Sequence, residues 1–168
     1  IYEVLTEYSR TVYHTNSDDE HIAIDENSIA VLPFVNMSSD PEQEYFSDGL
    51  TEEIITDLSH IEGLLVISRS SMMTYKGTSK KLLEIAREVK VRYVLEGSVR
   101  KAGNQLRITA QLIDAENDCH VWAEKYNGSI DDVFKIQEQV SRSIAEALNV
   151  KLTKEVEQQL SQHPVSNL

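Results

Sequence analysis

The sequence predicts an α/β fold with a mixed sheet, in the element order β-α-β-α-β-β-β-α. Two short apolar runs, at residues 29–32 and 64–67, flank a segment of helical periodicity, which is typical of parallel strands joined by a crossover helix. After residue 90 the pattern changes to alternating strands joined by tight turns, which indicates an antiparallel meander. A long amphipathic segment at the end predicts one more helix packed on the sheet.

The first predicted strand, at residues 29–32, is rich in β-branched side chains, which favours a strand covered on both faces. Pro33 cannot donate to a strand ladder, so either this strand lies at a sheet edge or the chain bulges at Pro33. A polar loop follows at residues 36–39. Asp40 and Pro41 then precede two acidic or amide residues, an order that is preferred where a helix begins.

The helix that begins there buries one stripe, because its apolar residues recur at a spacing of four. The stripe consists of Phe46, Leu50, Ile54 and Leu58. Gly63 is expected to end this helix, and residues 64–67 form the second strand. Residues 68–79 are small and polar, and residues 80–89 form the second crossover helix. Its apolar face is expected to contain Leu82, Leu83, Ala86 and Val89.

Three strands are expected to form the meander, at residues 91–100, 106–112 and 119–126. In the second of these, the apolar residues alternate with polar ones, which predicts a strand with one dry face. In the third, His120 and Trp122 are expected to share a face, with Trp122 contacting the core or a helix rather than serving as a binding platform. Residues 129–132 have the S-x-x-D capping pattern, so a helix should follow to about residue 152.

The same patterns divide the chain into three parts. Residues 1–27 are read as an amphipathic segment and an acidic linker, residues 28–152 as the α/β domain, and residues 153–168 as a helical connector or tail. The chain begins at an isoleucine, so we expect it to be a fragment of a longer protein. A segment outside it is then a candidate for an inner-membrane tether, with the domain in either the periplasm or the cytoplasm.

Charge and composition argue against two classes of partner. The formal net charge is −12, and no basic stripe with interleaved aromatic residues offsets it, so nucleic acid is not an expected partner. No apolar run approaches the roughly 20 residues that cross a bilayer, so direct membrane insertion is not expected. The lone Cys119 excludes an internal disulfide bond.

Motifs of the common enzyme and phosphate-binding classes are absent, so no catalytic residue, metal or cofactor is predicted for this chain. Asp114, Glu116 and Asp118 resemble the opening of a calcium loop, but Cys119 stands where that loop needs glycine. Cys119 and His120 are the residue types of a nucleophile and its base. As neighbours on a strand they should point to opposite faces, so a packed thiol and an ordinary histidine are the simpler interpretation.

Three blocks of this sequence resemble the TolB-like amino-terminal domain of bacterial multidomain signalling proteins. They are SIAVLPFVNMSSDPEQEYFSDGLTEEI, YVLEGSVRKAGNQLRITAQLIDA and WAEKYNGSIDDVFKIQEQV. In that family the domain lies between an upstream effector, either a class III adenylate or guanylate cyclase or a winged-helix DNA-binding domain, and downstream tetratricopeptide repeats. The segment GLLVISRSSMMTYKG is most similar to the cyclase-linked branch of this family. Lys90 departs from the family, which usually has glycine there, and this puts the end of the second helix in doubt.

Topology predicts one candidate ligand site, because ligands of parallel α/β units tend to bind beyond the carboxyl ends of the strands. The site would combine small polar residues, the start of a helix and one cation, which together suit a small anion. Its residues are Asn36, Ser38, Ser39, Asp40, Arg69 and Ser70. The alternative is that these residues only provide helix caps and turns.

The resemblance and the missing enzyme motifs together imply a non-catalytic sensory or protein-interaction domain. The expected partners are other proteins or the adjacent cyclase and repeat domains, with a homodimer and a small-molecule ligand as open alternatives. A second hypothesis makes the chain a regulatory part of a working cyclase, which contacts or dimerises the catalytic domain. A third makes it a passive assembly domain that takes up a partner peptide at the sheet edge near Pro33.

Overall fold

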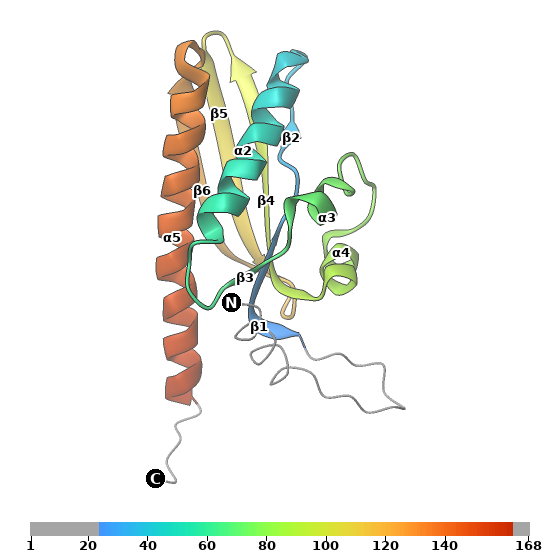
Figure 1. The fold of residues 1–168 in the computed structure, drawn as a ribbon, viewed down its shortest axis with the longest axis vertical. Helices are drawn as coiled ribbons and strands as arrows, with labels where there is room; N and C mark the ends of the chain where they lie inside the picture. Colours follow the sequence, from blue (N-terminus) through green and yellow to red (C-terminus); the bar gives the residue numbers. More distant parts are fainter. Residues whose placement is uncertain (1–23, 163–168) are drawn as a thin grey trace.

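A computed structural model describes residues 24–162 of the chain, and side chains up to residue 154. Its centre is a six-stranded mixed sheet in the order β3-β1-β4-β5-β6, with β2 also paired to β4 (Figure 1). The strands are β1 (Asp25–Val31), β2 (Val35–Asn36), β3 (Leu65–Val66), β4 (Val91–Ala102), β5 (Gln105–Asp114) and β6 (Cys119–Ser129). Strands β1, β2 and β3 run parallel to their neighbours, and β4, β5 and β6 form the antiparallel meander. The predicted fold class is therefore confirmed.

The helices form two unequal layers on the sheet. They are α2 (Glu42–Leu58), α3 (Arg69–Met73), α4 (Leu82–Val89), the short 3₁₀ helix η1 (Ile130–Asp132) and α5 (Val133–Gln162). Figure 1 shows α2 and α5 side by side on one face of the sheet. On the other face, α3 and α4 pack a small core over the first part of β4, and leave the remainder of that face uncovered.

The main core lies between the sheet and the pair α2 and α5. The predicted stripe of α2 is buried as expected, and in α5 the buried apolar residues are Ile136, Val140, Ile144, Leu148 and Leu152. They meet the dry face of β5, whose four apolar residues have no exposed surface: Leu106, Ile108, Ala110 and Leu112. Trp122 and Tyr126 of β6 pack against the same core, which confirms the expected core or helix contact of Trp122.

Pro33 lies in the break between β1 and β2. The edge interpretation is wrong for β1, which lies between β3 and β4. The bulge interpretation fits better, because Val31 pairs with Leu95 and Val35 pairs with Ser98, so one strand carries one more residue than its partner. The N–H of Leu32, the residue before Pro33, still donates to the Leu95 carbonyl at 2.9 Å.

Several boundaries differ from the prediction. The first strand begins at Asp25, inside the predicted linker, and the loop expected at residues 36–39 begins with a strand residue, Asn36. Helix α2 ends at Leu58, and Gly63 lies in the turn that follows, with φ +79°. The predicted polar segment 68–79 contains the helix α3. The amphipathic segment predicted at the start of the chain lies outside the described residues, as do residues 163–168.

A bulge in β6 corrects the predicted faces of that strand. Leu112 pairs with Trp122, but the next residue, Ile113, pairs with His120, so Val121 is the extra residue. A one-residue shift moves a side chain to the other face of a sheet. His120 therefore lies on the face opposite Trp122, and not beside it as expected.

Candidate functional site

The first half of the predicted ligand site forms a closed polar network after β2. The Asn36 amide donates to the Asp40 carbonyl at 3.0 Å, and the Asn36 side-chain oxygen accepts from the Ser38 N–H at 2.9 Å. The Asp40 carboxylate accepts from the Glu42 N–H at 3.0 Å and pairs with the Lys101 ammonium at 3.1 Å. These bonds, the one from Glu42 first, lower the pKa of Asp40 below its ordinary value. Asp40 is thus held as a charged cap for α2.

The second half of the predicted site lies in α3. The Ser68 hydroxyl caps this short helix, accepting from the Ser71 N–H, and Arg69 and Ser70 form its first turn. The Arg69 guanidinium is partly exposed and contacts the Glu52 carboxylate of α2 at 3.2 Å. No described contact joins Arg69 or Ser70 to the loop of Asn36, Ser38, Ser39 and Asp40. The structure brings together the members of each half, but shows no bond between the halves.

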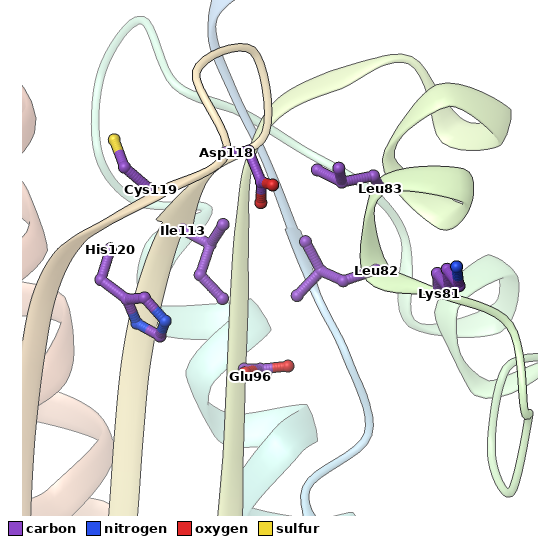
Figure 2. Close-up of a pocket in the computed structure, with 8 residues that line it drawn as sticks. All are labelled: Lys81, Leu82, Leu83, Glu96, Ile113, Asp118, Cys119 and His120. Carbon is purple, nitrogen blue, oxygen red and sulfur yellow. The ribbon is translucent and has the colours of Figure 1, made fainter.

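A hollow of about 330 Å³ lies between the start of α4 and the turn from β5 to β6. Figure 2 shows Leu82 and Ile113 facing each other at its centre, with Glu96 and His120 beside them. The Cys119 sulfur points away from His120, which argues against a nucleophile and base pair, as the sequence predicts. The predicted packed thiol is wrong, however, because Cys119 is exposed.

A second hollow of about 270 Å³ adjoins the edge strand β2. Its apolar wall comes from the segment around Pro33 and β2, and its polar wall from β4 and β5. Glu96 lines both hollows, and its carboxylate accepts a hydrogen bond from the Gln111 amide. Val35 and Met37, two residues that line this second hollow, are 55% and 54% exposed, so the hollow has an accessible apolar wall.

These hollows belong to one surface, the part of the sheet that α3 and α4 leave uncovered. We call it the open face, and it consists of Glu96, Ser98, Arg100, Arg107, Thr109, Gln111, Ala123, Lys125 and Asn127. Each of these residues alternates with a residue that points toward α2 and α5, and so the nine share one side. Sequence reasoning did not select any of them, although the alternation around the buried residues of β5 contained the signal.

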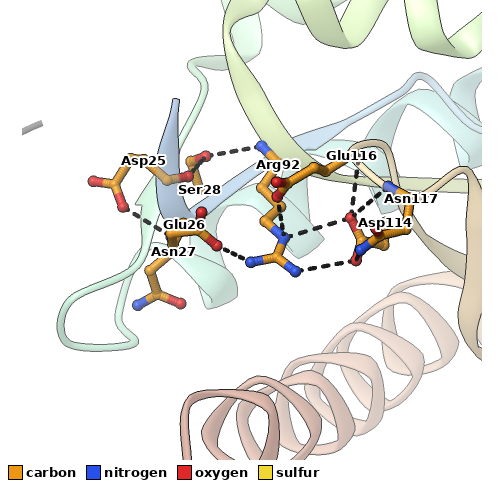
Figure 3. A network of polar contacts seen from close by, with 8 residues as sticks. All are labelled: Asp25, Glu26, Asn27, Ser28, Arg92, Asp114, Glu116 and Asn117. Carbon is orange, nitrogen blue, oxygen red and sulfur yellow. Dashed lines mark hydrogen bonds and ion pairs between the residues drawn. The ribbon is translucent and has the colours of Figure 1, made fainter. Parts of the chain in front are cut away.

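A buried ionic network at the other end of β4 has a structural role. Arg92 is 8% exposed, and its guanidinium lies between Glu26 and the Asp114 carboxylate, to which it donates at 3.2 and 3.4 Å (Figure 3). Asp114 also accepts from the Glu116 N–H at 3.0 Å and the Asn117 amide at 2.9 Å. Two of the three acidic residues that resemble a calcium loop, Asp114 and Glu116, therefore neutralise Arg92, and Asp114 also shapes the turn after β5.

Neither metal nor membrane features stand out in the described part of the chain. Among its residues, no group of three or more His, Cys, Asp or Glu side chains is placed to hold a metal ion. No helix there is both long enough and apolar enough to cross a bilayer. What the described surface offers is a polar sheet face with two adjoining hollows.

Comparison with solved structures supports the TolB-like fold. The chain resembles TolB from Acinetobacter baumannii with a TM-score of 0.50 and 19% identity, over 74% of this chain and 28% of TolB. It resembles a lipoprotein from Neisseria meningitidis with a TM-score of 0.52 and 19% identity, over 73% of this chain and 97% of the lipoprotein. At such identities the likeness concerns the fold alone.

Comparison with protein sequences identifies the family. A Rhizobium meliloti (strain 1021) protein named "Putative adenylate cyclase 3" is 57% identical over 126 residues, which are 75% of this chain and 22% of that protein. This chain thus spans about a fifth of the length of that relative. Residues 25–147 match the model of the family described as "HilA/YgeH-like transcriptional regulator, second domain". Because that match covers most of the chain, the chain belongs to this family of second domains.

Proposed function

We propose that this chain is a non-catalytic regulatory domain, which binds another protein and passes the effect to a neighbouring domain of a multidomain protein. The observation that carries this proposal is helix α5. Leu152 is the last buried residue among the side chains described, yet the helix continues for ten more residues to Gln162. Its end projects beyond α2 and the sheet (Figure 1), so it can serve as a rigid link to a neighbouring domain.

The contacts of α5 with α2 support the same role. The Gln137 amide donates to the Phe46 carbonyl at 3.1 Å, and the Ser141 hydroxyl donates to the Asp57 carboxylate at 2.7 Å. Gly49 lets the helices approach closely, because a Cβ there would lie 2.5 Å from the Gln137 amide nitrogen. A shift of the sheet and α2 upon binding would therefore move α5 as one body.

The test is to replace residues 28–152 in the intact protein with a flexible linker and to measure the output of the neighbouring effector. We expect basal activity to remain, because catalysis is assigned to another domain, while the response to the physiological signal is lost. An unchanged response would show that this domain does not relay the signal.

A second candidate function is that of a cyclase regulator that contacts the catalytic domain or completes its dimer. It is favoured by the 57% identity to the Rhizobium protein named as an adenylate cyclase. Cyclase activity should then depend on this segment even without a signal, and the dependence on protein concentration should change when it is removed. Identical activity and concentration dependence with and without the segment would exclude this candidate.

A third candidate is a passive assembly domain that adds a partner strand to the sheet. Strand β2 supports it, since β2 pairs with β4 and with no second strand among the described residues. NMR titration with neighbouring segments of the intact protein is the test. Shifts centred on Val35 and Asn36 are expected, and shifts confined to other regions would contradict strand addition.

A further inference from the structure

Two arginines on the open face stand directly opposite each other. Arg100 of β4 pairs in register with Arg107 of β5, and both side chains are exposed. Residues opposite each other in an antiparallel pair have Cβ atoms about 4.5–5.5 Å apart, and like charges in that position destabilise the sheet. The fold alone gives no reason to place two guanidinium groups there.

The pair also lacks a carboxylate partner within the described part of the chain. Arg107 donates to the Asn127 side-chain oxygen at 3.4 Å, which is a neutral contact, and Arg100 makes no hydrogen bond or ion pair with any described residue. By contrast, the neighbouring Lys101, which points to the other side of the sheet, is paired with Asp40. Acidic residues outnumber basic ones by 28 to 16 in this chain, so two adjacent arginines without an acidic partner are unexpected.

On the open face, the arginine pair and the hollow beside β2 follow one another along the direction of the strands. The row of Arg100 and Arg107 is followed by the row of Ser98, Thr109 and Lys125, and then by Glu96 and Gln111. Ser98 and Thr109 already line the hollow, together with the exposed Val35 and Met37. Rows two residues apart along a strand are separated by about 7 Å, which is also the distance between alternate side chains of an extended peptide.

We propose that the open face binds an extended acidic peptide segment of a partner protein. A carboxylate of the partner lies between Arg100 and Arg107, where two guanidinium groups can donate several charge-assisted hydrogen bonds. An apolar side chain two or three residues away enters the hollow beside Val35 and Met37. This proposal rests on the protein-binding role proposed above and specifies the chemistry of the partner.

An acidic peptide fits this surface better than a nucleic acid does. Nucleic-acid binding depends on neutralising many phosphates, whereas the open face carries only three cations, Arg100, Arg107 and Lys125, together with the anion Glu96. The net charge of −12 would repel a long polyanion, while a short segment meets only the local field.

The experiment measures fluorescence anisotropy with the full 168-residue chain and a labelled nine-residue peptide. The peptide carries two adjacent aspartates and a leucine two residues later, and a control peptide has asparagines in their place. We expect the acidic peptide to bind at low ionic strength and to weaken with added salt, and the control peptide to bind far more weakly. The variant with both Arg100→Gln and Arg107→Gln should bind roughly tenfold or more weakly, because charge-assisted hydrogen bonds are lost.

Arg142→Gln is the matched control, since Arg142 is an exposed arginine on α5, in the layer on the opposite side of the sheet. It should leave peptide binding unchanged. The double variant should also melt about 1–3 °C higher than the parent, because the repulsion between the two arginines is removed. A melting temperature that does not fall shows that weaker peptide binding is not caused by unfolding.

Four results would overturn the proposal. They are no binding by the parent chain, equal binding by the double variant, tighter binding of a labelled single-stranded DNA than of the peptide, and self-association of the parent that the double variant abolishes. The last would identify the occupant as a second copy of this chain. If peptide binding fails while domain replacement still removes the response of the intact protein, the regulatory function stands and only the partner chemistry is wrong.

Discussion

Lys90 ends α4 in a backbone conformation that suits glycine. It has φ 60° and ψ 53°, and its N–H donates to the Ala86 carbonyl to close the last turn. A side chain in the left-handed region costs roughly 1–2 kcal/mol. The sequence identifies Lys90 as a departure from the glycine of the resembled family, and the structure shows that the helix end keeps the geometry despite this departure.

Lys90→Gly is therefore expected to stabilise the domain. Relief of the left-handed strain is partly offset by the greater freedom of glycine in the unfolded chain, so we expect a net gain of about 0.5–1 kcal/mol. Urea denaturation measures this difference. Lys81→Gly is the control, because Lys81 has φ −71° and gains no relief, and it should destabilise. A loss of stability in Lys90→Gly would show that the lysine side chain contributes more than its strain costs.

Asp114 links the buried ionic network to the pH dependence of stability. Its burial would raise the pKa of the carboxyl, but the hydrogen bonds from Arg92 and Asn117 outweigh this, and the pKa lies below the ordinary value of 3.8. A lowered folded-state pKa means that the contribution to stability is complete above the unfolded pKa, near 3.9. It is lost as the pH falls through the folded-state pKa.

Asp114→Asn should cost about 3 kcal/mol at pH 7, because Arg92 loses its buried carboxylate and keeps only the exposed Glu26 and Glu116. Unfolding free energies measured between pH 2 and 6 should fall less steeply with acid in this variant than in the parent chain. Glu138→Gln, at an exposed position of α5, should change neither quantity. If the parent and Asp114→Asn lost stability equally with acid, Asp114 would not be the cause of this pH dependence.

At the scale of elements, the packing of β2 on β4 depends on Gly97. A Cβ at Gly97 would lie 2.5 Å from the Phe34 ring carbon Cζ and 2.5 Å from the Thr109 carbonyl oxygen. Phe34 is itself fixed, since it is 2% exposed and its N–H donates to the Thr51 hydroxyl of α2 at 2.9 Å. The phenyl ring thus takes the space of the missing side chain.

Gly97→Ala should destabilise the domain by about 2–3 kcal/mol, because neither the ring nor the carbonyl can move without disturbing the sheet. Gly49→Ala is the comparison. It meets only the flexible end of Gln137, and alanine favours a helix over glycine by about 1 kcal/mol, so its net effect should be near zero. Thermal unfolding of both variants tests the contrast, and equal losses would mean that the contact with Phe34 is not the cause.

Elements with a strong local period could be predicted, and elements made by tertiary pairing could not. The stripe of α2 runs from Phe46 to Leu58 and the alternation in β5 from Gln105 to Leu112, so the buried residues follow from the sequence. Strand β2 has two residues and exists because β4 lies beside it, and α3 has five residues capped by Ser68. The bulge at Val121 likewise depends on the partner strand, which explains the error for His120.

The candidate site was harder to predict than the fold for a similar reason. Topology predicted Asn36 and Asp40 beyond the end of a parallel strand, but Asn36 is the last residue of β2, and its amide donates to the Asp40 carbonyl while the Asp40 carboxylate pairs with Lys101. The open face arises because α3 and α4 cover only part of the sheet. The alternation in β5 indicates which residues face away from the main core, but which part of that face stays uncovered depends on the lengths and positions of those helices.

For the whole molecule, the relay role predicts that the response to signal depends on the direction in which the end of α5 faces around the helix axis. Two residues inserted after Leu152 turn the following helix by about 200°, while seven residues return it to within about 20° of its original direction. In the intact protein, the two-residue insertion should abolish the response to signal, and the seven-residue insertion should restore most of it. Effector output measured for both insertions tests this, and a response that ignores phase would argue for a flexible connection.

The extra residue at Val121 has a consequence for the behaviour of the protein in concentrated solution. Strand β6 forms the outer border of the sheet, with its far side unpaired in the described part of the chain, and such borders invite pairing with the borders of other molecules. The bulge interrupts the regular row of backbone donors and acceptors, and exposed Glu124 and Lys125 place charge along the remainder. The bulge at Val121, which caused the error in the predicted faces of β6, thus protects the domain against aggregation.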